Sequence, residues 1–229
     1  MSYRIWLPWY NKILNDFSYS RARDEFAARV LAELLKFKLK MSINELRKLI
    51  RDKNVYVFGA GDNLTLSINK IHKRKNDIFI SADSATSLLI KENKIPDIIV
   101  TDLDGNIKDL LCAHRKGSVA VIHAHGDNIE ALRKWVPKFR GKVIGTTQAE
   151  PFNNIYNFGG FTDGDRAVFL AEHFKARKIS LVGFDFKKVG KLSKNKNRAL
   201  KLKKLKWAER LITALCSSKS SPEILYYPY

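Results

Sequence analysis

Carboxylates placed directly after an apolar segment are the first sign of chemistry in this sequence. Residues 98–100 are Ile-Ile-Val, and the chain then reaches Asp102 and Asp104, followed by Gly105. Side chains alternate along an extended chain, so both carboxylates face one side and can bind a single cation, with Leu103 turned inward. Gly105 permits a sharp turn or a close approach. Taken alone, the pattern fits equally a turn at Asp104 with a helix cap at Asp102.

Similar carboxylates follow other apolar segments. Asp83 follows DIFISA, Asp127 follows VAVIHAHG, and Asp185 follows ISLVGF. Gathered in one crevice, these charges would repel one another unless a cation neutralised them. The sequence therefore predicts a metal site, and hard oxygen ligands favour Mg²⁺. His123 and His125 share one face of an extended strand and keep Zn²⁺ or Mn²⁺ open as alternatives.

Six runs rich in β-branched residues define the elements that must position these carboxylates. The runs are VYVFG, DIFISAD, DIIVTD, VAVIHAH, KVIGTT and ISLVGFD, and helix-length segments separate them. Continuous apolar runs of this kind predict parallel strands that are covered on both faces. We therefore expect an α/β fold with a doubly wound, mostly parallel sheet of about six strands and helices on both faces. In such sheets ligands bind beyond the carboxyl ends of the strands, where all of these carboxylates lie.

Residues 1–52 precede the first strand and are expected to form a helical N-terminal extension packed on the main domain. A helix over residues 18–39 is indicated by apolar residues at helical spacing, namely Phe26, Val30, Leu31, Leu34 and Leu35. A second helix begins at Ser42, which Glu45 can cap. Trp6, Trp9 and Tyr10 should pack on the main domain, because no basic amphipathic helix surrounds them to form a membrane anchor. The main α/β domain should span residues 53–229 and end in a basic helix.

The length and composition fit one main domain and no membrane span. The chain has 229 residues, of which 45% are hydrophobic, enough for one sizeable core. Cys112 and Cys216 fit neither a disulfide framework nor a metal-binding spacing, which indicates a reducing compartment. No apolar stretch approaches the roughly 20 residues of a membrane span, and the N-terminus lacks the apolar core of a signal peptide. We expect a soluble, cytoplasmic protein.

The net charge of +19 is concentrated near the C-terminus. Ten Lys or Arg residues and no acidic residue lie between Lys187 and Lys206. This basic segment is either a solvated surface or a surface that attracts polyanions such as nucleotide phosphates. Because it has no interleaved aromatic residues for base stacking, a nucleic-acid-binding protein is the weaker, non-enzymatic alternative.

Four longer segments resemble the archaeal 6-hydroxymethyl-7,8-dihydropterin pyrophosphokinase family. They are ADSATSLLIKENKIPDIIVTDLDGN, HAHGDNIEALRKW, GTTQAEPFNNIYNFGGFTDGDRAVFLAEHF and ISLVGFDF, and the resemblance spans roughly residues 50–215. More distantly, they are similar to the catalytic domain of thiamine pyrophosphokinases. The resemblance implies an ATP-dependent pyrophosphokinase with Mg²⁺ as cofactor. It would transfer pyrophosphate from ATP to the hydroxymethyl group of a reduced pterin and release AMP, in the biosynthesis of folate-like or methanopterin-like carriers.

The motifs of the thiamine enzymes can be placed on this sequence, with departures. The matching residues are Asp83, the metal-binding pair Asp102 and Asp104, Asp127, and the later Gly159, Gly160 and Asp163. Thr101, Phe161 and Gly164 stand where the thiamine enzymes have Gly, Arg and His. The chain also ends in a basic helix where those enzymes continue into a β-sandwich that helps bind thiamine. Thiamine is therefore a poor candidate substrate.

These considerations give a set of expected site residues. Asp102, Asp104 and Asp127 are expected to be catalytic and to bind Mg²⁺. The residues expected to bind ATP or the pterin are Gly59, Gly61, Asp83, Ser84, Thr101, His125, Thr146, Thr147, Gln148, Gly160, Thr162, Asp163, Asp185 and Lys187. Thr162 or Asp163 could instead be an ordinary helix cap. We also expect the basic segment to act as a flap over ATP, bending at Gly190 and Ser193.

Three alternatives to this function stay open. Two are enzymes, a thiamine-type pyrophosphokinase and a nucleotide-sugar transferase with an Asp-x-Asp motif, and the third is the nucleic-acid-binding protein. A homodimer is compatible with each. The expected partners are ATP and a reduced pterin, with no membrane. Formation of AMP from ATP and a dihydropterin would separate the pyrophosphokinase from the others.

Overall fold

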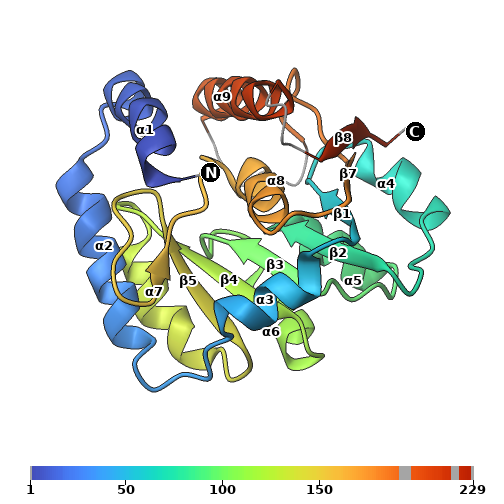
Figure 1. Ribbon diagram of the computed structural model, residues 1–229, viewed down its shortest axis with the longest axis horizontal. Coiled ribbons are helices and arrows are strands. Elements are labelled where there is room, and N and C mark those ends of the chain that lie inside the picture. The colour runs from blue at the N-terminus through green and yellow to red at the C-terminus, as the bar shows by residue number, and fades with distance from the viewer. Residues whose placement is uncertain (1, 191–196, 218–221, 228–229) are drawn as a thin grey trace.

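The computed structural model describes residues 2–190, 197–217 and 222–227. Its centre is a parallel sheet of eight strands in the order β6-β5-β4-β3-β2-β1-β7-β8 (Figure 1). The strands are β1 (Asn54–Phe58), β2 (Asp77–Ala82), β3 (Ile98–Thr101), β4 (Val119–Ala124), β5 (Val143–Thr147), β6 (Ile155–Tyr156), β7 (Lys178–Val182) and β8 (Glu223–Tyr226). All their pairings are parallel. The α/β fold with a mostly parallel sheet is confirmed, and the expected six runs are β1 to β5 and β7.

Two strands were missing from the sequence prediction. β6 has only two residues, too few to show a pattern. β8 lies at the edge of the sheet with its residues mainly exposed, so it lacks the apolar run of a covered strand.

Helices cover both faces of the sheet because alternate side chains of each strand point to opposite faces. One face packs against α1 (Tyr3–Phe17), α3 (Ile43–Ile50), α8 (Asp163–His173) and α9 (Arg198–Cys216). The other packs against α2 (Arg21–Leu34), α4 (Leu64–Ser67), α5 (Ala85–Lys91), α6 (Ile107–Arg115) and α7 (Ile129–Trp135). In β3, Ile98 and Val100 belong to the first core and Ile99 to the second. Short 3₁₀ turns, Ile68–Lys70 and Val136–Lys138, follow α4 and α7.

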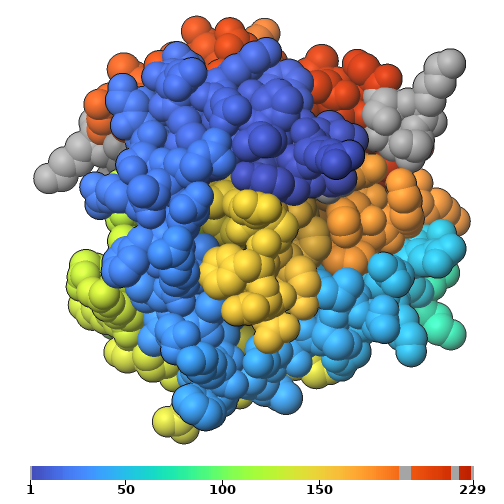
Figure 2. Space-filling model, turned by 60° about the vertical axis from the view of Figure 1, so that its left-hand side comes forward, coloured from blue at the N-terminus to red at the C-terminus, as the bar shows by residue number. Residues whose placement is uncertain are grey.

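The N-terminal helices pack on the α/β core, as the sequence predicts. Trp6 is buried and its Nε1 donates to the backbone oxygen of Gln148 at 2.8 Å. Trp9 meets Trp207 of α9 edge to face, with ring centroids 6.4 Å apart. In Figure 2 the N-terminal helices, in blue, lie against the yellow segment that follows β5. The expected cap of Ser42 by Glu45 is also present.

The prediction for the helix after residue 18 is wrong in two details. The helix ends at Leu34, and Phe26 is 48% exposed. Its buried face carries Asp24, Ala27 and Ala28 together with the expected Leu31. The helix is rotated so that Asp24 can accept hydrogen bonds from Tyr10, Gly126 and Gln148. Leaving a buried carboxylate without hydrogen-bond donors would cost more free energy than exposing one aromatic ring.

The basic C-terminal helix is α9, as expected. Residues 191–196 of the proposed flap lie outside the described residues. No helix in the described ranges combines the length and the apolar character that a membrane crossing requires.

Candidate active site

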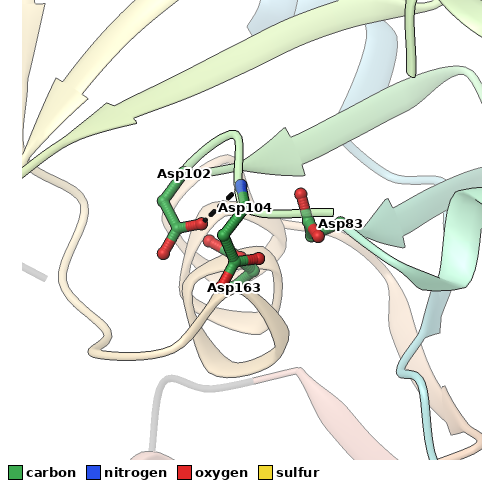
Figure 3. A group of neighbouring side chains, drawn as sticks. All are labelled: Asp83, Asp102, Asp104 and Asp163. Atoms are coloured by element: carbon green, nitrogen blue, oxygen red, sulfur yellow. Dashed lines mark hydrogen bonds between the residues drawn. The ribbon is translucent and has the colours of Figure 1, made fainter. Parts of the chain in front are cut away.

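Four aspartates meet at the carboxyl ends of β2 and β3 and the first turn of α8 (Figure 3). They are Asp83, Asp102, Asp104 and Asp163, and one ligand atom from each lies within 4.8 Å of the others. We call them the aspartate cluster. Their oxygens are the hard ligands that suit Mg²⁺. The position is also where an open parallel sheet normally builds its site.

The loop after β3 brings Asp102 and Asp104 close to Asp83. Leu103 is buried and adopts a left-handed conformation with φ of 70°, so the loop turns tightly between the two aspartates. At Gly105 a Cβ atom would lie 2.1 Å from Oδ2 of Asp83. Glycine is therefore required for the two loops to approach. Thr101 donates from its hydroxyl to Asp83 and accepts from the N–H of Leu103, which ties the two loops together.

Asp163 reaches the cluster from α8. Thr162 is the N-cap residue, and its N–H and hydroxyl both donate to Asp165, so Asp163 is not needed as the cap. Its carboxylate is only 13% exposed and accepts from Nη1 of Arg166 at 3.1 Å. The N-terminal end of a helix carries a partial positive charge, which helps hold a carboxylate there.

Asp102 is the member of the cluster whose ionised form is most favoured. Burial by itself would raise the pKa of Asp102, but a hydrogen bond from His125 and the positive charge of Arg166 bring it below its usual range. Nε2 of His125 lies 3.3 Å from Oδ2 of Asp102, and its Nδ1 accepts from the N–H of Asp127. Since Nδ1 is an acceptor, Nε2 carries the proton and donates to Asp102.

The other three carboxyl groups resist ionisation. Burial, with the charges of Asp104 and Asp102, raises the pKa of Asp83 to about 8. Burial and the charge of Asp102 raise the pKa of Asp163 well above its usual value. The pKa of Asp104 is raised mainly by Asp102 and also by burial. A divalent cation would remove this repulsion and hold all four in their charged form.

A pocket opens beside the cluster. Its walls come from the ends of β1, β2 and β7, the start of α8, and one face of α9. Of the expected residues, the pocket is lined by Gly59, Gly61, Asp83, Ser84, Asp104, Thr162, Asp163 and Asp185. A ligand bound in this pocket would therefore contact the cluster.

The chain matches the family model described as "6-hydroxymethylpterin diphosphokinase MptE-like" over residues 29–190. It belongs to this family. Two relatives are named 6-hydroxymethyl-7,8-dihydropterin pyrophosphokinase. The one from Pyrococcus furiosus is 47% identical over 93% of each chain. The one from Methanocaldococcus jannaschii is 40% identical over 94% of this chain and 96% of its own. The predicted family and enzyme class are confirmed.

One solved structure shares the fold of this family member at low sequence identity. The MAf glycosyltransferase from Magnetospirillum magneticum aligns over 91% of this chain and 38% of its own, with a TM-score of 0.52 and 12% identity. At this identity the similarity concerns the fold alone.

Some residues expected at the site of this family member lie away from the cluster. Asp127 is exposed, with Oδ1 4.0 Å from Arg23, and lines a second depression together with His125. Lys187 is exposed and does not line the pocket, whereas Lys188 does. The carboxylate of Asp185 accepts from the N–H groups of Lys187 and Lys188, which shapes their loop.

Other expected residues support the site from the interior. Thr146 and Thr147 are buried in β5. The side chain of Gln148 donates a hydrogen bond to Asp24 and accepts one from Arg166. Gly160 has φ of 89° and packs against the backbone of Arg166. Gly59 and Gly61 are explained by the close approach of Gly183, since a Cβ at Gly61 would lie 2.6 Å from its oxygen. His123 is buried, burial lowers its pKa, and its ring centroid lies 6.1 Å from that of His125.

Sequence reasoning missed two cations near the cluster. Arg166 stands three residues after Asp163, the spacing at which helical side chains meet, and this signal was available. Lys201 lines the pocket from α9. It was hidden among the many lysines of the basic segment, because only the packing of α9 shows which of them faces inward.

Proposed function

We propose that this chain transfers pyrophosphate from ATP to the hydroxymethyl group of 6-hydroxymethyl-7,8-dihydropterin. The hydroxymethyl oxygen bonds to the β-phosphorus of ATP, the bond from that phosphorus to the α,β-bridging oxygen breaks, and the hydroxyl proton is released. The products are AMP and the pterin diphosphate, which suits the biosynthesis of folate-like or methanopterin-like carriers. The partners are ATP and the reduced pterin.

The aspartate cluster beside the pocket is the observation that carries this proposal. Diphosphate transfer moves concentrated negative charge, and its catalysis is mostly positioning and charge neutralisation. The carboxylates repel a nucleotide when they are ionised, so the site fits phosphates best when a divalent cation lies between the two. Relatives of similar length, 40% and 47% identical, carry the name of the same activity.

The residues of the cluster fit Mg²⁺. When bound, Mg²⁺ would neutralise phosphate oxygens and the growing charge of the leaving group. Asp102 would hold it in ionised form, because His125 and Arg166 stabilise its charge. Asp104 faces the open pocket and Asp163 approaches from α8, where Arg166 fixes its carboxylate. Thr101 fixes the carboxylate of Asp83 through its hydroxyl.

Product analysis tests the proposal directly. With Mg²⁺, ATP and the dihydropterin, we expect AMP and pterin diphosphate in a one-to-one ratio, and neither product after EDTA treatment. Asp102→Asn should lower kcat by at least about a hundredfold, the scale of losing one electrostatic contact to a transition state. Asp52→Asn is the matched control, since Asp52 is 82% exposed and precedes β1 at the opposite end of the strands. Formation of ADP, or no reaction, would contradict the proposal.

A further inference from the structure

The pocket beside the aspartate cluster has a lysine in the wall that α9 contributes. This face of α9 carries Lys201 together with the apolar residues Leu205 and Ala208. Their spacing of four and then three residues places them on one side of the helix. Figure 1 shows α9 lying alongside α8, whose first turn carries Asp163. Lys201 therefore borders the same cavity as Asp104 and Asp163.

Several other cations of α9 attach the helix to the rest of the protein. Nζ of Lys203 lies 2.9 Å from the carboxylate of Asp16 in α1. Lys204 lies over the rings of Tyr19 and Phe161, at 5.6 and 5.8 Å. Arg198 donates to the backbone oxygen of Val189 at 3.4 Å. These contacts fix the orientation of α9 and so the direction in which Lys201 points.

Lys201 differs from these cations. The residue is half-buried, and within residues 2–190, 197–217 and 222–227 its ammonium group forms no hydrogen bond and no salt bridge. The charge of Lys201 acts across the cavity on Asp104 and lowers the pKa of that carboxyl group. This effect opposes those of Asp102 and of burial, which raise the same pKa. A phosphate group in the cavity could form charge-assisted hydrogen bonds with this ammonium group.

Lys188 is the other lysine of the pocket, but it already has a partner. Its Nζ lies 3.4 Å from the carboxylate of Asp62, and its side chain is 63% exposed. Among the described residues, Lys201 is therefore the lysine lining the pocket whose ammonium group is not already in a salt bridge.

We propose that Lys201 binds the β- and γ-phosphate groups of the nucleotide in this pocket. The inference rests on the proposed function, because it takes the ligand to be ATP. The phosphates would lie between the cation-loaded aspartate cluster and the ammonium group of Lys201, so that both sides of the chain of phosphates are neutralised. A lysine acts there as a compact point charge, which suits phosphate groups that change partners during transfer.

The test compares the affinities of ATP and AMP. Lys201→Gln should weaken binding of Mg-ATP by about tenfold or more, since 1.4 kcal/mol of lost binding corresponds to that factor. Binding of AMP, which lacks the β- and γ-phosphates, should change by less than about threefold on the same scale. Lys201→Arg should retain most of the ATP affinity. Calorimetry on the full chain gives both constants, and the KM for ATP should rise in parallel.

Lys206→Gln is the matched control. It removes the same charge from the same helix, but Lys206 is exposed and does not line the pocket. Its ATP affinity should equal that of the wild type at the same salt concentration. Equal weakening by both variants would mean that only the general field of the basic segment acts, and would overturn the inference.

The remaining outcomes separate the inference from the proposed function. If the wild type forms AMP and Lys201→Gln binds ATP normally, the inference is wrong and the proposed function stands. If Lys201→Gln selectively loses ATP binding but the wild type forms no AMP with the dihydropterin, the phosphate contact is right and the reaction is wrong. Equal losses for ATP and AMP would assign Lys201 to the shape of the pocket and overturn the inference. If Lys201→Gln melts early, Lys201→Met gives the same comparison with an apolar chain of similar length.

Discussion

Asp102 and Asp104 are two residues apart and lie in opposite electrostatic environments. Asp102 has His125 and Arg166 as favourable neighbours, which keep its pKa low. Asp104 has Asp102 as its strongest neighbour, and the repulsion raises its pKa. The N–H of Asp104 also donates to Asp102 at 3.3 Å, so the pair is held together in spite of its charge (Figure 3). The same motif therefore combines a carboxylate whose ionised form is stabilised with one whose ionised form is destabilised.

This contrast predicts different effects for the same substitution. Without metal, Asp104→Asn should stabilise the fold by about 0.5 to 1 kcal/mol, because it removes a repulsion that water partly screens. Asp102→Asn should not stabilise it, since His125 loses its charged acceptor. Both variants should lose most of the activity and most of the rise in Tm that MgCl₂ gives the wild type. Thermal melting in EDTA and in MgCl₂ at matched ionic strength measures these effects. A destabilised Asp104→Asn in EDTA would show that repulsion does not dominate there.

The element that stabilises the site from outside the sheet is the pair of N-terminal helices. Asp24 of α2 accepts from the hydroxyl of Tyr10 in α1 at 2.7 Å and from the backbone N–H of Gly126 at 2.7 Å. Gly126 follows His125, the partner of Asp102. Burial, and then the charge of Asp24, raise the pKa of Tyr10, so its phenol stays protonated as a donor. The helices thus fix the loop that orients His125.

We therefore expect Tyr10→Phe to cost about 1 to 3 kcal/mol of stability, the range for leaving a buried partner short of a hydrogen bond. For a chain of this length that corresponds to a fall in Tm of roughly 2 to 4 °C per kcal/mol. Tyr3→Phe is the control, because in the described part of the chain the hydroxyl of Tyr3 accepts a hydrogen bond only from Arg21, at a longer distance of 3.3 Å. Equal stability of the two variants by thermal melting would show that the contact between Tyr10 and Asp24 contributes little.

At the scale of the whole molecule, the sequence predicts what is periodic and local and misses what depends on packing. The six apolar runs became strands because each is long enough to show burial on both faces. The sequence predicted that Asp102 and Asp104 would meet, but it assigned this to alternation along an extended chain. In the structure β3 ends at Thr101, and the left-handed conformation of Leu103 turns the loop between the two carboxylates. The place of Asp163 in the cluster, in contrast, depends on how α8 lies on the sheet, and that of Lys201 on how α9 lies on α8. Phe26 shows the same limit, since the rotation of α2 follows from the partners of Asp24.

The distribution of charge gives a last prediction for the molecule as a whole. The net charge is +19, from 42 basic and 23 acidic residues, so many cations cannot have an acidic partner. Ion pairs such as Lys36 with Glu33 are exposed and contribute little. Screening should therefore relieve more repulsion than it removes attraction, and the protein should gain stability as salt increases.

Thermal melting in EDTA with about 0.05 M and 0.5 M NaCl checks this expectation, since the Debye length falls severalfold over that range. We expect Tm to rise by a few degrees, on the scale of 1 kcal/mol. The same rise should occur in Asp104→Asn, because screening acts on the whole surface and does not need the aspartate cluster. A rise confined to the wild type would instead assign the effect to the cluster, with Na⁺ occupying it. A fall in Tm would mean that the surface ion pairs outweigh the repulsion among the excess lysines and arginines.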